Sequence, residues 1–185
     1  EALIGYAAMN GRLPRPAQSA SNGQERTAAC ANDADCTGFV PWLTLGVSKV
    51  DAWGKLLRYS VSPGYAGGSD GITLISFTTT STLETKTIKE ADPSTPANLA
   101  NLSTTIPAVI FSQGQGRWGY NNEGVLLGDG TNNNPDEDNN QSASQIFISR
   151  PASEAAHPRG EFDDIVIWLS PYTLKAKLLA AGRWY

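Results

Sequence analysis

The stretch ALIGYAAMNGRLPRP, residues 2–16, carries the clearest fold signal in the chain. Between residues 2 and 9 the apolar side chains recur at spacings of three and four, which places them on one face of a helix. Asn10 and Gly11 form a stop signal, and two prolines follow. A helix this short is marginal by itself in water. We therefore expect it to pack on the domain or to continue a longer helix.

The composition predicts one loop-rich domain that contains β-structure. The chain has 185 residues, with 18 glycines and 11 prolines, and no internal repeat or linker divides it. Its formal net charge of −4 argues against a basic face for nucleic acid or anionic lipid. No stretch approaches the roughly 20 apolar residues that a membrane-spanning helix needs.

The two cysteines, Cys30 and Cys36, lie in the stretch AACANDADCTGF. The small and polar residues around them are typical of an exposed loop, so the spacing predicts a small disulfide loop and an oxidising compartment. Two reduced thiols in the core are the alternative. A zinc site is disfavoured because no second cysteine pair exists and the single histidine, His157, lies far downstream.

Alternating side chains predict a β-sheet in the middle of the chain. Residues 51–61 alternate as a strand with one buried face, and residues 71–79 read as a second strand. The turn between them is rich in glycine, which predicts a hairpin. Further strands are predicted at 83–89, 105–114, 145–150 and 161–170, one helical turn at 96–102, and an extended segment or short helical turn at 39–47.

The end of the chain predicts a helix over residues 171–182. Ser170 is a suitable N-cap, and Pro171 occupies the first helical position, where its missing N–H costs nothing. Apolar side chains recur along one face, and Gly182 provides the stop.

Catalytic motifs are scarce, and we expect no enzymatic activity. His157 lies in a loop flanked by proline and glycine, which is typical of a solvated loop residue. A hydrolase that uses Glu161 or Asp164 is an alternative, since paired carboxylates can cleave glycosides. However, adjacent residues on a strand point to opposite faces, so Asp163 and Asp164 are not expected to face one substrate.

The loop 128–144, GDGTNNNPDEDNNQSAS, offers many carboxylate and amide oxygens. Calcium takes six to eight such ligands. We therefore select Asp129, Asp136 and Asp138 as calcium ligands, with Asp163 as a distant contributor. A solvated acidic loop without a metal is the alternative.

Five tryptophans and six tyrosines raise the possibility of a glycan-binding face. Such a face would use Trp118, Trp42 and Tyr120, in a secreted glycan- or surface-binding module with no role in a filament. Most of these side chains lie in apolar stretches that are typical of core packing.

Three parts of the chain together resemble one known family. The stretch ALIGYAAMNGRLPRP resembles the end of the long N-terminal helix of type IV pilin-like proteins, and VDAWGKLLRYSV resembles the entry to the first strand of type II secretion pseudopilins. The stretches AVIFSQGQGRWG, QIFISRP and FDDIVIWLS resemble the later strands of prepilin-type cleavage/methylation proteins.

The resemblance implies an α+β, pilin-like fold, in which an N-terminal helix packs on an antiparallel β-sheet with long loops and a short C-terminal helix. The whole chain, 1–185, would be one domain. Residues 1–10 would be the remnant of the N-terminal helix, 11–50 a connecting region, 51–170 the sheet with its loops, and 171–182 the C-terminal helix.

The resemblance also implies a function. The chain would be a structural subunit of a type IV pilus or a type II secretion-like pseudopilus, assembling through its N-terminal helix. The apolar half of that helix, before residue 1, would be the membrane anchor. The partners would be other pilin or pseudopilin subunits and an inner-membrane assembly platform, in the periplasm or at the surface of a Gram-negative bacterium. The family's calcium loop would correspond to 128–144.

Overall fold

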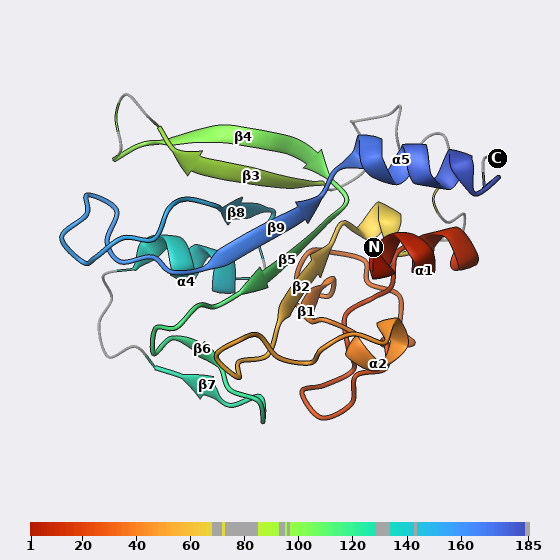
Figure 1. The fold of residues 1–185 in the computed structure, drawn as a ribbon, viewed down its shortest axis with the longest axis horizontal. Helices are drawn as coiled ribbons and strands as arrows, with labels where there is room; N and C mark the ends of the chain where they lie inside the picture. Colours follow the sequence, from red (N-terminus) through yellow and green to blue (C-terminus); the bar gives the residue numbers. More distant parts are fainter. Residues whose placement is uncertain are drawn as a thin grey trace.

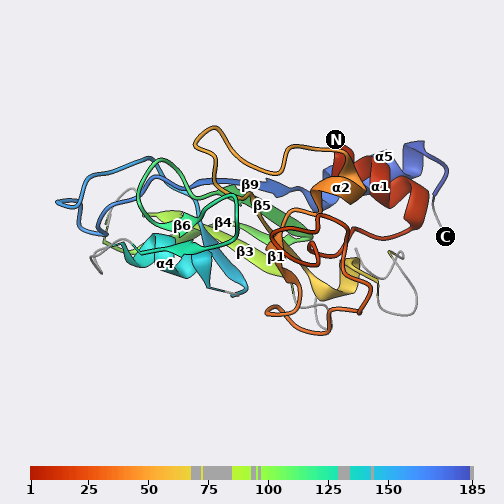
Figure 2. The ribbon, with the colours of Figure 1, turned by 90° about the horizontal axis from the view of Figure 1, so that it is seen from below.

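The computed structural model describes residues 1–67, 72, 85–92, 95, 97–128, 134–142 and 144–183. The described residues form a four-stranded and a three-stranded β-sheet that lie against each other, and a separate two-stranded sheet. Both terminal helices lie at the same end of the molecule (Figures 1 and 2). The helices are α1 (Ala2–Asn10), α2 (Trp42–Leu45), the 3-10 turn η1 (Pro63–Tyr65), α4 (Pro135–Gln141) and α5 (Pro171–Ala180). The strands are β1 (Thr37–Phe39), β2 (Arg58–Val61), β3 (Lys86–Ala91), β4 (Leu99–Ile106), β5 (Ala108–Ser112), β6 (Gly119–Tyr120), β7 (Leu126–Leu127), β8 (Ile146–Ile148) and β9 (Ile165–Leu169).

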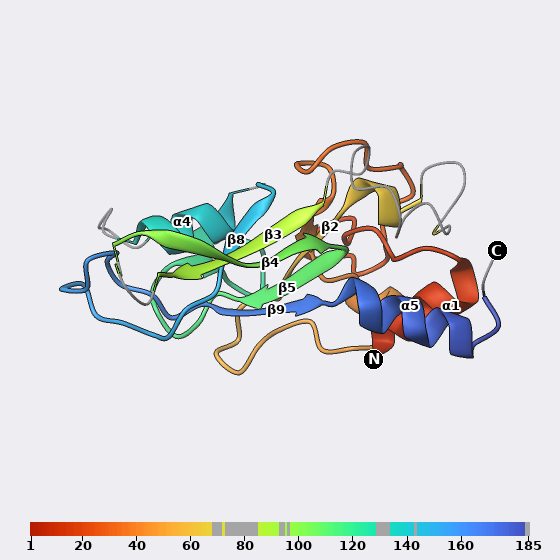
Figure 3. The same cartoon turned by 90° about the horizontal axis from the view of Figure 1, so that it is seen from above.

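The first sheet has the strand order β1-β2-β5-β9, and each neighbouring pair is antiparallel. Its register places Tyr59 opposite Ile110, and Ile110 opposite Ile167. The second sheet has the order β4-β3-β8, in which β3 and β8 run parallel. The chain passes from β4 into β5 through Pro107 alone, so one continuous run of chain links the two sheets (Figure 3).

The hydrophobic core has two main parts, one on each face of the first sheet. Alternate side chains of β5 point to opposite faces, so Val109 and Phe111 face the second sheet while Ala108 faces α1 and α5. The core between the sheets contains Ile88, Ile106, Val109, Phe111, Phe147 and Val166. On the other face, Leu3 and Ala7 of α1 pack with Tyr59, Val61 and the α5 side chains Leu174 and Leu178.

Both terminal helices are confirmed. Helix α1 ends at Asn10, and Gly11 follows in the left-handed conformation with φ 69°. In α5, the Ser170 hydroxyl accepts a hydrogen bond from the Thr173 N–H, as predicted for an N-cap. Helices α1 and α5 lie side by side (Figure 3). None of the described helices is long and apolar enough to cross a membrane.

The predicted strand at 51–61 is present only in its last part, as β2. All four β2 side chains are buried, since Tyr59 and Val61 pack in the core with α1 and Arg58 lies over the rings of Phe39 and Tyr120. The hairpin partner, 71–79, lies outside the described residues apart from Ile72. Strand β2 pairs with β1 on one edge and with β5 on the other, so neither edge is left for that partner.

Two other local predictions are wrong. Where a helical turn was predicted at 96–102, residues 99–102 are instead the first half of the partly exposed strand β4, and residue 96 lies outside the described residues. The loop predicted over 128–144 contains helix α4. Pro135 begins this helix, and three carboxylates follow in the first turn, where the helix dipole favours negative charge. The segment 39–47 is confirmed as a short helical turn, α2, after strand β1.

Candidate functional site

The main candidate site is an apolar groove on the open face of the first sheet. It has a volume of about 480 Å³ and lies between the first turn of α1, the segment after α2, and strands β5 and β9. Its lining residues are Glu1, Ala2, Leu3, Ile4, Val40, Leu45, Val47, Ser48, Leu57, Ala108, Ile110, Ile167, Trp168 and Leu169. Almost all are apolar, so the groove is suited to an apolar partner.

The alternation of β9 explains why this face is apolar and open. Ile165, Ile167 and Leu169 share the face of Ile110, whereas Val166 points into the core between the sheets. Helix α1 covers only one end of this face, so Ile165 and Ile167 are 52% and 57% exposed. Adjacent exposed isoleucines beside an apolar groove are typical of an interaction surface.

The position of α1 at the edge of the groove is held by polar contacts. The Tyr6 hydroxyl donates to Glu25, and the Arg12 guanidinium donates to both oxygens of the same carboxylate at 2.7 Å. Burial raises the pKa of Glu25, but hydrogen bonds from Arg12 and Tyr6 outweigh burial and lower the pKa to about 2. The Tyr59 hydroxyl, below α1, donates to the carbonyl of Pro14 at 2.9 Å.

A second candidate site is a cluster of three carboxylates. Glu137 of α4 meets Asp163 and Asp164, and one oxygen of each lies within 4.8 Å of the others. The expectation that Asp163 and Asp164 face apart is therefore wrong. Strand β9 begins only at Ile165, so the two aspartates lie in irregular backbone, where neighbouring side chains need not alternate.

Each carboxylate of the cluster accepts hydrogen bonds from the protein. The Asp163 N–H donates to Glu137 at 2.6 Å, the Gly116 N–H donates to Asp163 at 2.5 Å, and Asn140 donates to Asp164 at 2.9 Å. Burial raises the pKa of Asp164 well above its usual value, and the charges of Glu137 and Asp163 add to that shift. Burial also raises the pKa of Glu137. Hence protons compete with any cation for this cluster.

Lys55 supplies positive charge beside the cluster, a role that no sequence motif predicts. Its ammonium group donates to the carbonyls of Gln113, Gly116 and Trp118 at 2.6–2.9 Å, which uses all three of its protons. Burial lowers the pKa of Lys55, while Asp163 and the other nearby carboxylates act in the opposite direction.

The aspartates selected as calcium ligands differ in their surroundings. Asp129 lies outside the described residues. Asp136 is buried and ion-paired, with Arg150 Nε at 2.7 Å and the Arg159 guanidinium on both oxygens. Asp138 lies two residues further along α4 and is exposed, because two residues of a helix differ by about 200° in direction. The calcium site at these three residues stays a prediction, whereas Asp163 does belong to a carboxylate cluster.

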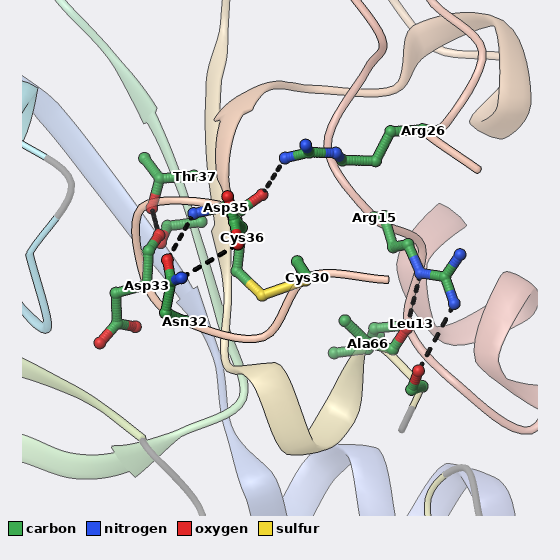
Figure 4. Close-up of a disulfide and its surroundings, with 12 residues drawn as sticks. Leu13, Arg15, Arg26, Cys30, Asn32, Asp33, Asp35, Cys36, Thr37 and Ala66 are labelled. Carbon is green, nitrogen blue, oxygen red and sulfur yellow. Dashed lines mark hydrogen bonds between the residues drawn. A yellow bond between two sulfur atoms is a disulfide. The ribbon is translucent and has the colours of Figure 1, made fainter. Parts of the chain in front are cut away.

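The predicted disulfide is confirmed, since Cys30 and Cys36 are bonded (Figure 4). The two cysteines are buried although the residues between them are mostly exposed. Their side chains belong to the core that α1, α5 and β2 share. The residues between the cysteines form the predicted exposed loop, but the disulfide itself is buried in the core.

The residues selected for the alternative functions form no open site among the described residues, although Trp42 and Tyr120 pack in one small apolar cluster. His157 accepts the Arg159 N–H in a turn at 3.1 Å, and Glu161 is exposed. Trp42 is 9% exposed and packs against Gly23, so its ring offers no open platform. Tyr120 packs edge-on against Phe39, with a ring-centroid distance of 5.2 Å.

Comparisons with known proteins found no relative of this chain. No family model, curated protein or solved structure matches the chain.

Proposed function

We propose that this chain is a pilin-like structural subunit of a type IV pilus or a type II secretion-like pseudopilus. The observation that carries the proposal is the apolar groove between the first turn of α1 and the open face of β5 and β9. The groove begins at the N-terminal end of α1, so an apolar helix that leads into α1 would meet it. Burying Ile167 and its neighbours against such a helix would remove apolar surface from water.

In this proposal the chain works by assembly and performs no catalysis. The apolar helix anchors the subunit in the inner membrane and then packs against its copies in the filament. Other pilin subunits and an inner-membrane platform are the partners. A disulfide between Cys30 and Cys36 is in keeping with a periplasmic or cell-surface location, because such bonds persist in oxidising compartments.

The coding sequence upstream of Glu1 provides the first test. We expect it to encode about 20 apolar residues, the length that spans a bilayer, after a short basic leader that ends in glycine. An upstream sequence that encodes a polar domain or a cleavable secretion signal would refute the proposal.

An assembly assay with the full-length protein in its own host provides the second test. We expect Ile167→Lys to remove the subunit from sheared filaments, because it places a charge in the groove. Leu126→Lys is the matched control, since Leu126 is also exposed but lies on β7 outside the groove. Equal incorporation of both variants would contradict a role for the groove in assembly.

A further inference from the structure

Lys86 is a buried cation at the start of β3. Its side chain is fully buried and shares a face with Ile88, which belongs to the core between the sheets. Within the described residues, its ion-pair partner is Asp33. Burial alone lowers the pKa of Lys86 to about 7, whereas the Asp33 carboxylate acts in the opposite direction and favours the charged form.

Asp33 reaches Lys86 from the loop that the disulfide closes. The loop runs from Cys30 to Cys36, and the bridge holds their Cα atoms 5.1 Å apart. Asn32 accepts the Cys36 N–H at 3.0 Å, so the residues around Asp33 form a compact turn. Figure 4 shows the Asp33 carboxylate on the outer side of this turn, pointing away from the sulfur atoms.

The two ends of the loop are held in different ways. At the Cys36 end, the cysteine carbonyl accepts the Val61 N–H at 3.0 Å, and Thr37 pairs with Ser60 in the sheet. At the Cys30 end, residues 27–29 and 31–32 are exposed. The disulfide is thus the covalent tie between the exposed end of the loop and the sheet.

We propose that the Cys30–Cys36 disulfide is a redox latch that keeps Asp33 on Lys86. A dithiol reductant supplies two electrons and two protons, the S–S bond breaks, two thiols form, and the reductant leaves as its own disulfide. Without the bridge the turn keeps only its own hydrogen bonds, such as that from the Thr37 hydroxyl to the Asp33 carbonyl at 2.8 Å, and the Asp33 carboxylate moves away from Lys86. A buried ammonium without its carboxylate is strongly unfavourable, so the start of β3 opens and Lys86 becomes accessible to water. This inference does not depend on the filament proposal.

The competing explanation is that the disulfide acts only by closing a short loop. A cross-link removes conformational freedom from the unfolded chain whatever its loop contacts. In that case reduction would lower stability, but Lys86 would remain buried in the folded protein. The accessibility of Lys86 therefore separates the two explanations.

Amine labelling of the native chain tests the latch directly. The protein is treated with an acylating reagent, with and without dithiothreitol, and the label is located by peptide mass spectrometry. We expect Lys86 to be protected when oxidised and labelled at least about tenfold faster when reduced, with an unchanged far-UV circular dichroism spectrum. Lys177, which is exposed on α5, is the internal control and should label equally in both states.

Two results would overturn the latch. The first is a Lys86 that stays protected after reduction is complete, and the second is loss of the whole circular dichroism spectrum on reduction. The second result would mean that the bridge supports the entire fold and not this contact.

Variants provide an independent check. In Lys86→Met no buried ammonium remains, so reduction should lower the melting temperature less than in the wild type. Asp35→Asn, in the same loop but hydrogen-bonded to Asn32, should behave as the wild type does. Asp33→Asn should leave Lys86 open to the label even in the oxidised protein. Equal melting losses in the wild type and Lys86→Met would support loop closure alone.

Discussion

Arg12 and Glu25 form a two-point ion pair, with each of two guanidinium nitrogens 2.7 Å from a different carboxylate oxygen. The Tyr6 hydroxyl and the Arg15 backbone N–H donate to the same carboxylate. Tyr6 belongs to α1, whereas Glu25 lies in the connecting segment. One carboxylate therefore joins the helix beside the groove to the loop that follows it.

Glu25→Gln should destabilise the protein by roughly 2 kcal/mol, because hydrogen bonds to charged groups are worth more than neutral ones. The amide also cannot accept from both sides of the Arg12 fork. Urea denaturation measures the change in the free energy of unfolding. Glu123→Gln, at an exposed turn, is the matched control and should change little. A Glu25→Gln variant as stable as this control would show that the contacts are incidental.

Acid should weaken the contacts of Glu25 with Arg12 and Tyr6 in a defined range of pH. The folded-state pKa of Glu25 is about 2, below its usual value of 4.5, so its contribution to stability is complete above about pH 4.5. That contribution is lost as the pH falls from there towards 2. The melting temperature of the wild type should therefore drop more steeply over this range than that of Glu25→Gln. Parallel curves would contradict the lowered pKa.

Gly114→Ala should damage the carboxylate cluster. Gly114 has φ 61°, and an added Cβ would lie 2.1 Å from Asp163 Oδ1. Left-handed backbone strain alone costs about 1–3 kcal/mol, and the overlap adds to it, so we expect a loss of at least roughly 2 kcal/mol. Gly128→Ala, which meets no atom within 4 Å, is the control. Thermal unfolding of both variants decides the matter, and similar melting temperatures would count against the close packing.

Lys55→Met should destabilise the protein by about 3 kcal/mol, because three carbonyls lose their donor and the carboxylates lose their nearby cation. The variant should also raise the pKa of Asp164 further, since the Lys55 charge lowers it in the wild type. Carboxyl NMR resonances followed through a pH titration would measure this. An unchanged Asp164 titration would exclude electrostatic coupling between the two residues.

Calcium should act through the cluster of Glu137, Asp163 and Asp164. We expect millimolar calcium to raise the melting temperature, and to do so more at higher pH, because protons compete with the cation for Glu137 and Asp164, whose pKa values are raised by burial. Asp163→Asn should abolish the effect, whereas its loss in Asp138→Asn instead would favour the site predicted from the sequence. If millimolar calcium does not stabilise the wild type, calcium binding by this cluster is refuted.

Several elements can be predicted from the sequence because local chemistry determines them. Gly11 ends α1 because it adopts a left-handed conformation, and Ser170 starts α5 because its hydroxyl accepts a free N–H. The Cys30–Cys36 pairing follows from a separation of six residues. In contrast, the acidic and asparagine-rich composition of α4 does not predict a helix, and the local preferences of residues 99–102 do not predict the strand β4.

The candidate sites were decided by tertiary structure. Glu137 and Asp163 are 26 residues apart, and they meet because α4 packs on β8 while the chain before β9 is irregular. Lys55 reaches carbonyls about 60 residues away, a contact that no local pattern encodes. The sequence by itself determined the ends of α1 and α5, the disulfide and the approximate positions of β2, β3, β5, β8 and β9, since those depend on neighbouring residues. The groove, the carboxylate cluster and the Asp33–Lys86 pair depend on which faces pack together, which only the folded chain decides.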